Sequence, residues 1–125
     1  SNVIAVEGAK NNITSNVIAP IAKSRLTEDL LGPMADALQP ELVTPLVAYL
    51  VSPSCDITHE IFSIGGGRIA RVFLGLTPGW FAGKGNLFTP EDVAANIDAI
   101  RDTSTFEIPG SVMEETMALM QALNG

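Results

Sequence analysis

The sequence has a single cysteine and a single histidine among 125 residues. Because Cys55 has no second cysteine to pair with, an internal disulfide is excluded and a reducing compartment is expected. One histidine and one cysteine are also too few for a structural zinc site, so no metal ligands are assigned. The first residues carry no basic and apolar signal segment, and we therefore expect a cytoplasmic protein.

Basic residues are scarce as well: seven Lys and Arg stand against fourteen Asp and Glu, which gives a net charge of -7. From Asn86 onward there are seven acidic residues and one basic residue. This balance argues against a nucleic-acid partner, since neutralising phosphates requires clustered Lys and Arg. We interpret the acidic carboxyl-terminal part as solvated helix surface.

Long apolar runs are absent, although 46% of the residues are hydrophobic. No run approaches the ~20 residues that a membrane-spanning helix needs, so no membrane span is expected. In a chain of one domain's length, this much apolar surface has to be buried against protein. Part of this surface is therefore expected to be covered by a partner or by a missing segment, and the homo-oligomer expected here is what the family resemblance described below implies.

The first half of the chain alternates helical and strand patterns. Residues 3–9 suit an apolar-faced helix, 13–19 a strand that ends at Pro20, and 57–64 a second strand. Between the strands, Gly32-Pro33 divides residues 26–38 into two short helical pieces, with Thr27 as a possible cap. Residues 40–51 predict a helix with a wide apolar stripe assigned to the core. Strand, helix and strand in this order favour a parallel pair with a right-handed crossover.

Beyond Gly67 the pattern changes. Glycines and prolines in 68–85 predict an ordered but irregular segment. Thr89-Pro90-Glu91-Asp92 has the cap, proline and acid that begin a helix, and Ser111 with Glu114 repeats this signature for a final helix. The last helix carries three methionines, which we interpret as core filling in preference to an adaptable apolar surface. We accordingly expect one domain over 1–67 and an irregular linker with a two-helix extension over 68–125.

A glycine pattern, Gly65-x-Gly67-x-x-Ala70, follows the second strand. It is similar to a degenerate dinucleotide fingerprint, in which glycines let a pyrophosphate approach a helix N-terminus. No helix is expected after this glycine pattern. We therefore interpret the glycines as the end of the second strand, where the absence of side chains lets the strand pack closely on another backbone segment. The spacing of glycines in residues 79–84 does not match a phosphate-binding loop. His59 is accompanied neither by the Gly-x-Ser-x-Gly motif of a serine hydrolase nor by the second histidine of a zinc protease.

Four stretches of the chain resemble segments of one protein family. Val6-Glu7-Gly8-Ala9-Lys10 and Asn16-Val17-Ile18-Ala19-Pro20 resemble the segment that follows the catalytic Tyr-x-x-x-Lys of short-chain dehydrogenases/reductases. Pro40-Glu41-Leu42-Val43 and Ile61 to Gly67 resemble the following helix and the last strand of that family. A narrower resemblance, carried by residues 19–27 and by Phe88 to Asn96, is to the (3R)-hydroxyacyl-CoA dehydrogenase domains of type 2 multifunctional enzymes.

The resemblance implies an α/β fold: the carboxyl-terminal part of a Rossmann-like doubly wound parallel sheet, with NAD or NADP across the carboxyl ends of its strands. It implies cofactor binding by the loop after the first strand, and a lid of apolar residues over an acyl-CoA-type substrate. The cofactor-binding residues would be Pro20, Ala22, Lys23, Ser24 and Thr27. The substrate-binding residues would be Leu26, Leu30, Leu31 and Met34.

The chain departs from the family in one respect that decides its activity. Tyr49, the only tyrosine, has Pro53 four residues on, so no Tyr-x-x-x-Lys can be placed and no catalytic residue is assigned. The glycine-rich loop and the catalytic serine would lie before Ser1. We therefore expect a dehydrogenase fragment that by itself is inactive and binds no cofactor tightly. Two alternatives stay open: a non-catalytic interaction module that oligomerises through strand edges, and a nucleotide-binding protein that uses residues 65–70.

Overall fold

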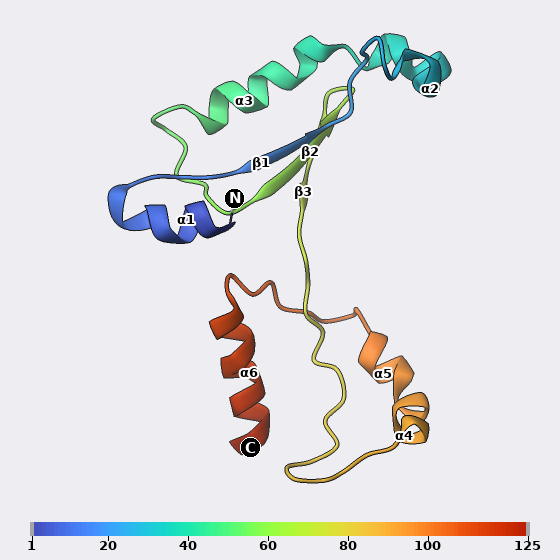
Figure 1. Ribbon diagram of the computed structural model, residues 1–125. Helices are drawn as coiled ribbons and strands as arrows, with labels where there is room; N and C mark the ends of the chain where they lie inside the picture. Colours follow the sequence, from blue (N-terminus) through green and yellow to red (C-terminus); the bar gives the residue numbers. More distant parts are fainter. Residues whose placement is uncertain (1, 125) are drawn as a thin grey trace. The chain divides into compact units, whose positions relative to one another are not determined.

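The computed structural model describes residues 2–124, and these divide into two compact units, residues 2–73 and residues 74–124. The first unit holds α1 (Asn2–Gly8), η1 (Ala9–Asn11), β1 (Val17–Pro20), α2 (Glu28–Leu31), η2 (Gly32–Ala37), η3 (Pro40–Val43), α3 (Thr44–Leu50), β2 (Ile61–Gly65) and β3 (Arg68–Val72). The second unit holds α4 (Pro90–Ala95), α5 (Ile97–Arg101) and α6 (Val112–Asn124). Figure 1 shows these elements in sequence colours.

The first unit is built on a three-stranded sheet in the order β1-β2-β3 (Figure 1). β1 and β2 are parallel, with Val17 opposite Ile61 and Pro20 opposite Ile64, as the strand, helix, strand pattern predicts. The α/β class expected from the sequence is confirmed. Ile64, on the central strand, is the large side chain with the least exposure in the described chain, at 1%.

A strand that the sequence did not predict extends this sheet. Residues 68–72 were expected to be irregular, but they form β3 antiparallel to β2, with Gly65 opposite Arg68. The turn between the strands is Gly66-Gly67, and both glycines have positive φ, 57° and 81°. Positive φ at both central positions is the geometry of a two-residue hairpin turn, which only glycine and a few polar residues adopt without strain. The glycine pattern at 65–70 therefore serves a hairpin.

Most predicted helices of the first unit are present. The division of 26–38 is confirmed as α2 and η2, and the 40–51 helix is divided into η3 and α3 at Thr44. The core assignment of its apolar stripe is only partly right: Leu46 is buried, whereas Val51 is 78% exposed. The predicted strands were too long at their amino-terminal ends, since β1 begins at Val17 and β2 at Ile61.

The second unit contains three helices in its described part, where two were expected. The predicted helix after Thr89 stops at Asn96, whose φ of -110° and ψ of 8° leave the helical region and separate α4 from α5. An isolated antiparallel bridge joins Leu76 to Glu107. The three methionines of α6, Met113, Met117 and Met120, are 55–68% exposed, so their interpretation as core filling is wrong within this chain.

The start of α4 is the predicted capping box, and it leads to a pH-dependent prediction. The Thr89 amide and hydroxyl both donate to Asp92 Oδ2 at 2.9 Å, and these bonds lower the pKa of Asp92 below its ordinary value of 3.8. Since the folded pKa is depressed, the cap stabilises the helix fully above the ordinary pKa of 3.8 and loses this effect as pH falls through the folded value. A carboxyl NMR titration should show the lowered pKa.

The matched variant for this titration is Thr89→Ala, which removes one of the two donors and should raise the pKa of Asp92 toward 3.8. Asp102 serves as the internal control, because its pKa is lowered by the Ser104 amide at 2.9 Å and should not move. An Asp92 pKa that is the same in both proteins would contradict the capping assignment.

Candidate functional site

The predicted cofactor loop begins at the carboxyl end of β1, and its start is fixed by two backbone hydrogen bonds. The Ile21 amide donates to the Ile64 carbonyl of β2 at 2.7 Å, and the Lys23 amide donates to the Leu38 carbonyl at 2.7 Å. The loop is thus tied to the central strand on one side and to the end of η2 on the other. Among the described residues, the Ala22 amide between these two anchors donates no hydrogen bond.

Hydrogen bonds of the Thr27 hydroxyl hold the middle of this loop. Oγ1 accepts from the Ser24 amide at 2.9 Å and lies 3.1 Å from the Ala22 carbonyl, to which it can donate. Ser24 Oγ is 2.9 Å from the same oxygen. A threonine hydroxyl has one proton. If Thr27 donates this proton to the Ala22 carbonyl, the Ser24 hydroxyl must donate its own proton to Thr27 Oγ1. The lone pairs of Ser24 Oγ are then free to accept a hydrogen bond.

This arrangement corrects the role expected for Thr27. The residue precedes α2, but its side chain makes no capping hydrogen bond to that helix. It folds back on residues 22–24 instead. Four of the five predicted cofactor-binding residues are therefore joined by one hydrogen-bonded loop, and the fifth, Pro20, ends the strand that leads into it.

Lys23 is held by two carboxylates at the outer side of the loop. Its Nζ lies 3.1 Å from Glu28 Oε1 and 3.5 Å from Asp36 Oδ1. The hydrogen bond and charge of Glu28 raise the pKa of Lys23, with Asp36 contributing less. The ammonium group is therefore engaged within the protein, and a ligand would meet the backbone of this residue more readily than its side chain.

Three of the four predicted substrate-contacting side chains are largely exposed. Leu26 is 90% exposed, Leu30 85% and Met34 63%, whereas Leu31 is half-buried. All lie on the segment from the loop through η2. Apolar side chains of this size are normally covered, so the segment presents an uncovered apolar surface next to the hydrogen-bonded loop.

Gly65, at the carboxyl end of β2, allows the loop to approach. A Cβ built on it would lie 2.8 Å from the Ile21 carbonyl oxygen and 3.0 Å from Ile21 Cβ. This contact confirms the prediction that the glycine-rich end of the second strand packs closely on another backbone segment. The carboxyl ends of both parallel strands consequently meet at one edge of the sheet, where ligands bind in open α/β sheets.

Removing the Thr27 hydroxyl should loosen this loop. We expect Thr27→Val to lower the free energy of unfolding by about 1–2 kcal/mol, because the Ser24 amide loses its acceptor. Thr27→Ser, which keeps the hydroxyl, is the matched control and should stay within about 0.5 kcal/mol. Urea denaturation followed by circular dichroism measures both. Equal stability of the two variants would show that the hydroxyl does not hold the loop.

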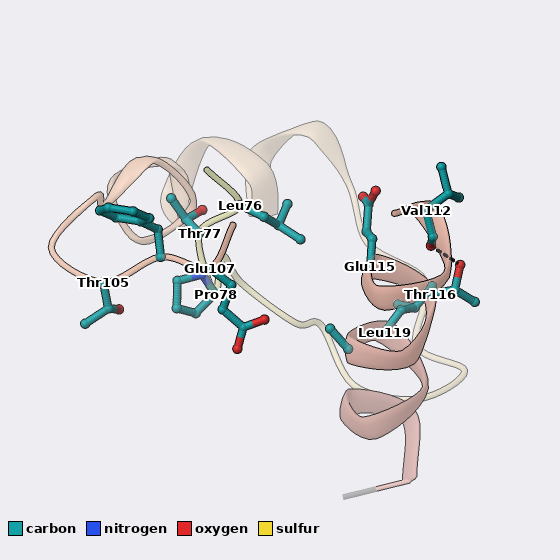
Figure 2. Close-up of a pocket in the computed structure, with 11 residues that line it drawn as sticks. Leu76, Thr77, Pro78, Thr105, Glu107, Val112, Glu115, Thr116 and Leu119 are labelled. Atoms are coloured by element: carbon teal, nitrogen blue, oxygen red, sulfur yellow. Dashed lines mark hydrogen bonds between the residues drawn. The ribbon is translucent and has the colours of Figure 1, made fainter. Parts of the chain in front are cut away.

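The second unit contains a groove that the sequence did not predict. It has a volume of about 810 Å³ and lies between the Leu76–Glu107 bridge and α6, from which Glu115, Thr116 and Leu119 contribute (Figure 2). Thr116 Oγ1 donates to the Val112 carbonyl at 2.8 Å, so that hydroxyl serves the helix. A second cavity of about 460 Å³ includes Trp80 and Phe88, whose rings meet edge to face at 5.6 Å. The bridge joins residues far apart in the chain, and no local pattern indicates it.

Among the described residues, neither the loop nor the groove has the side chains of a metal site. Among residues 2–124, no cluster of three His, Cys, Asp or Glu side chains is close enough to hold a metal ion. His59 has a positive φ of 67°, and its amide donates to the Ser15 carbonyl at 2.8 Å. Within this range no helix is both long and apolar enough to cross a membrane. The features described above that suit a ligand are the loop of residues 21–27, the exposed apolar side chains of the adjoining segment and the two cavities of the second unit.

Comparison with known proteins gives relatives that cover nearly the whole chain. No family model matches it. It is 39% identical over 125 residues to the peroxisomal multifunctional enzyme type 2 of Mus musculus, a match that covers 98% of this chain and 17% of the relative. It is 40% identical over 114 residues to a putative short-chain type dehydrogenase/reductase of Mycobacterium tuberculosis, covering 87% of this chain and 38% of the relative.

A solved structure agrees with these relatives. Full-length peroxisomal multifunctional enzyme type 2 from Drosophila melanogaster superposes with a TM-score of 0.81 at 27% identity, over 98% of this chain and 23% of that chain. The chain therefore spans well under half the length of these relatives. Its resemblance to short-chain dehydrogenases/reductases is confirmed.

Proposed function

We propose that this chain, a homologue of the carboxyl-terminal half of short-chain dehydrogenases/reductases, forms that part of an NAD(P)-dependent enzyme acting on a hydroxyacyl-CoA or related lipid or steroid. The enzyme would interconvert a hydroxyl and a ketone. The observation that carries the proposal is the hydrogen-bonded loop of residues 21–27 at the carboxyl ends of two parallel strands. That edge is where open α/β sheets bind nucleotides.

The loop offers two groups to a nicotinamide carboxamide. The Ala22 amide is a donor without an acceptor among the described residues, and Ser24 Oγ can accept when it donates to Thr27. A carboxamide has an oxygen that accepts and an NH₂ group that donates. We assign the carboxamide oxygen to the Ala22 amide and the carboxamide NH₂ group to Ser24 Oγ. Thr27 positions both groups. Pro20 and Lys23 determine the path of the loop backbone.

The exposed side chains of the adjoining segment suit an acyl chain. Leu26, Leu30 and Met34 are exposed apolar side chains of this segment, and Leu31 among them is half-buried. Binding pockets for lipids bury such side chains with the ligand. We propose that a lid built from α2 and η2 covers the acyl part of the substrate.

The catalytic tyrosine and lysine have to come from a segment outside this sequence, so the test uses a fusion. The part of the Mycobacterium tuberculosis relative that precedes its matched segment is joined to the amino-terminus of this chain. NADH and NADPH oxidation with a 3-ketoacyl-CoA is then measured. We expect turnover by the fusion and none by the 125-residue chain.

A variant links turnover to the loop. Ser24→Ala in the fusion should raise the KM for the cofactor about 5–10-fold, as expected for a lost hydrogen bond of about 1–1.5 kcal/mol. Arg25→Ala, at the neighbouring exposed position, is the control and should leave the KM within twofold. A folded fusion that binds neither cofactor would refute the proposed function.

Two further properties follow as proposals. Self-association is proposed because Leu87, Leu26 and Leu74 are 88–100% exposed, and light scattering of the purified chain tests it. The name of the mouse relative places that protein in the peroxisome, which differs from the cytoplasmic location expected here. We propose a reducing compartment that suits the single Cys55, and microscopy of a fluorescent fusion distinguishes peroxisome from cytoplasm.

A further inference from the structure

We infer that the groove of the second unit is a binding site for an amphiphilic organic cation, that is, an amine or ammonium group attached to an alkyl chain. The groove lies within residues 76–119, so the inference does not depend on the proposed dehydrogenase activity. One wall comes from the Leu76–Glu107 bridge and its neighbours, and the other from α6 (Figure 2). The volume of about 810 Å³ lies within the range of roughly 300–1,000 Å³ that is usual for small-molecule pockets.

The wall formed by the bridge is held in place by hydrogen bonds of the protein itself. The Leu76 amide donates to the Glu107 carbonyl at 2.8 Å, and the Glu107 amide donates to the Leu76 carbonyl at 2.9 Å. The Thr77 hydroxyl donates to the Ile100 carbonyl of α5 at 3.0 Å. This wall therefore has its shape before any ligand binds, and its backbone donors are already used.

Each wall contributes one carboxylate without a cationic partner. Glu107 lines the groove from the bridge, and Glu115 lines it from α6. Among the described residues, all ion pairs are formed by Lys23 and Arg71, which lie in the first unit. No Lys, Arg or His lines the groove. Opposite charges attract more strongly beside apolar protein walls than in bulk water, so a cation in the groove gains from both carboxylates.

Much of the remaining lining is apolar and uncovered. Val112 is 79% exposed, Leu119 57% and Phe106 46%. Large apolar side chains are more often buried, and an alkyl chain lying in the groove would cover them. The groove thus offers carboxylates to a cationic head group and apolar side chains to its chain.

The charge of the groove selects this occupant over the alternatives. A fatty acid or a phosphate-bearing ligand would meet two like charges, and a neutral lipid would leave both carboxylates unpaired. Residues 102–124 contain four acidic residues and no basic residue. Two copies of the chain that paired these faces would therefore bring like charges together, which disfavours association.

Three probes of equal chain length test the head-group preference: n-octylamine, n-octanol and n-octanoate. Each is titrated into the 125-residue chain and followed by amide and methyl NMR. We expect shifts on α6 and at the bridge, with the amine binding about 5-fold more tightly than the alcohol and the octanoate weakest. Added salt should reduce the advantage of the amine, because it screens the charges. Equal affinities of amine and alcohol would overturn the inference.

Matched variants separate the charge of the groove from the overall acidity of the chain. Glu115→Gln should weaken binding of octylamine about 2–5-fold and leave octanol unchanged. Glu91→Gln is the control, because Glu91 is an exposed residue of α4 that does not line the groove. Equal losses of octylamine affinity in the two variants would overturn the inference.

A second pair of variants tests the apolar wall. Leu119→Asn should weaken the binding of octylamine and octanol alike, whereas Leu87→Asn, at a fully exposed leucine outside the groove, should weaken neither. Circular dichroism checks that both variants are folded. Shifts on α6 that grow with the concentration of the chain in the absence of a probe would assign this face to a second copy and overturn the inference.

Discussion

Replacement of Ile64 by alanine is expected to lower the free energy of unfolding of the first unit by about 2–5 kcal/mol. Ile64 is 1% exposed and sits on the central strand, opposite Pro20 of β1 and Ile69 of β3. The deletion removes buried aliphatic groups and leaves a cavity on the face of the sheet from which this side chain projects. Since small domains have only about 5–15 kcal/mol of stability, this single change should remove a large share of it.

Ile69→Ala is the matched control, because Ile69 is the same residue type directly across the ladder but is 51% exposed. We expect this variant to lower the free energy of unfolding by less than about 1 kcal/mol. Urea denaturation curves of the three proteins give the comparison. Equal losses at the two positions would mean that the core of the sheet does not lie where the structure has it.

Gly65→Ala is expected to cost about 2–4 kcal/mol, which combines overpacking with a lost hydrogen bond. The added Cβ meets the Ile21 carbonyl oxygen at 2.8 Å, and backbone cannot rotate away. The loop must move outward, which breaks the bond from the Ile21 amide to Ile64. Amide NMR shifts should therefore change across residues 21–27 as well as in the hairpin.

Gly67→Ala separates this contact from a general effect of replacing glycine. Gly67 has a φ of 81° and no atom within 4 Å of a built Cβ, so its replacement costs about 1–2 kcal/mol of backbone strain alone. Its shift changes should stay in the hairpin. If Gly65→Ala leaves the loop resonances in place, the close approach of loop and strand is wrong.

Features set by neighbours in sequence could be predicted. The capping box at Thr89 and Asp92 and the division at Gly32-Pro33 depend on local turn chemistry. The parallel strand pair joins distant residues, and it could be predicted because strand, helix and strand follow one another along the chain. The position of the candidate cofactor loop at the end of a strand followed from the family motifs. The structure confirms that this loop follows β1, whereas the contacts of its residues with a ligand stay a prediction.

Features set by distant contacts could not be predicted. β3 exists because it pairs with β2 through the Gly66-Gly67 turn, although residues 68–72 show few strand signals of their own. The role of Thr27 depends on the path of residues 22–24 and not on helix propensity. Exposure of Leu26, Leu30 and the α6 methionines depends on what covers these segments, which periodicity does not reveal.

NMR of the fusion titrated with NAD and NADP tests the proposal that residues 21–27 face the nicotinamide of a dehydrogenase. We expect cofactor-dependent amide shifts at Ala22, Lys23 and Ser24 that weaken in Ser24→Ala, with the hairpin at 65–70 little affected. Shifts centred on residues 65–70, or saturable binding that leaves residues 21–27 unmoved, would contradict it.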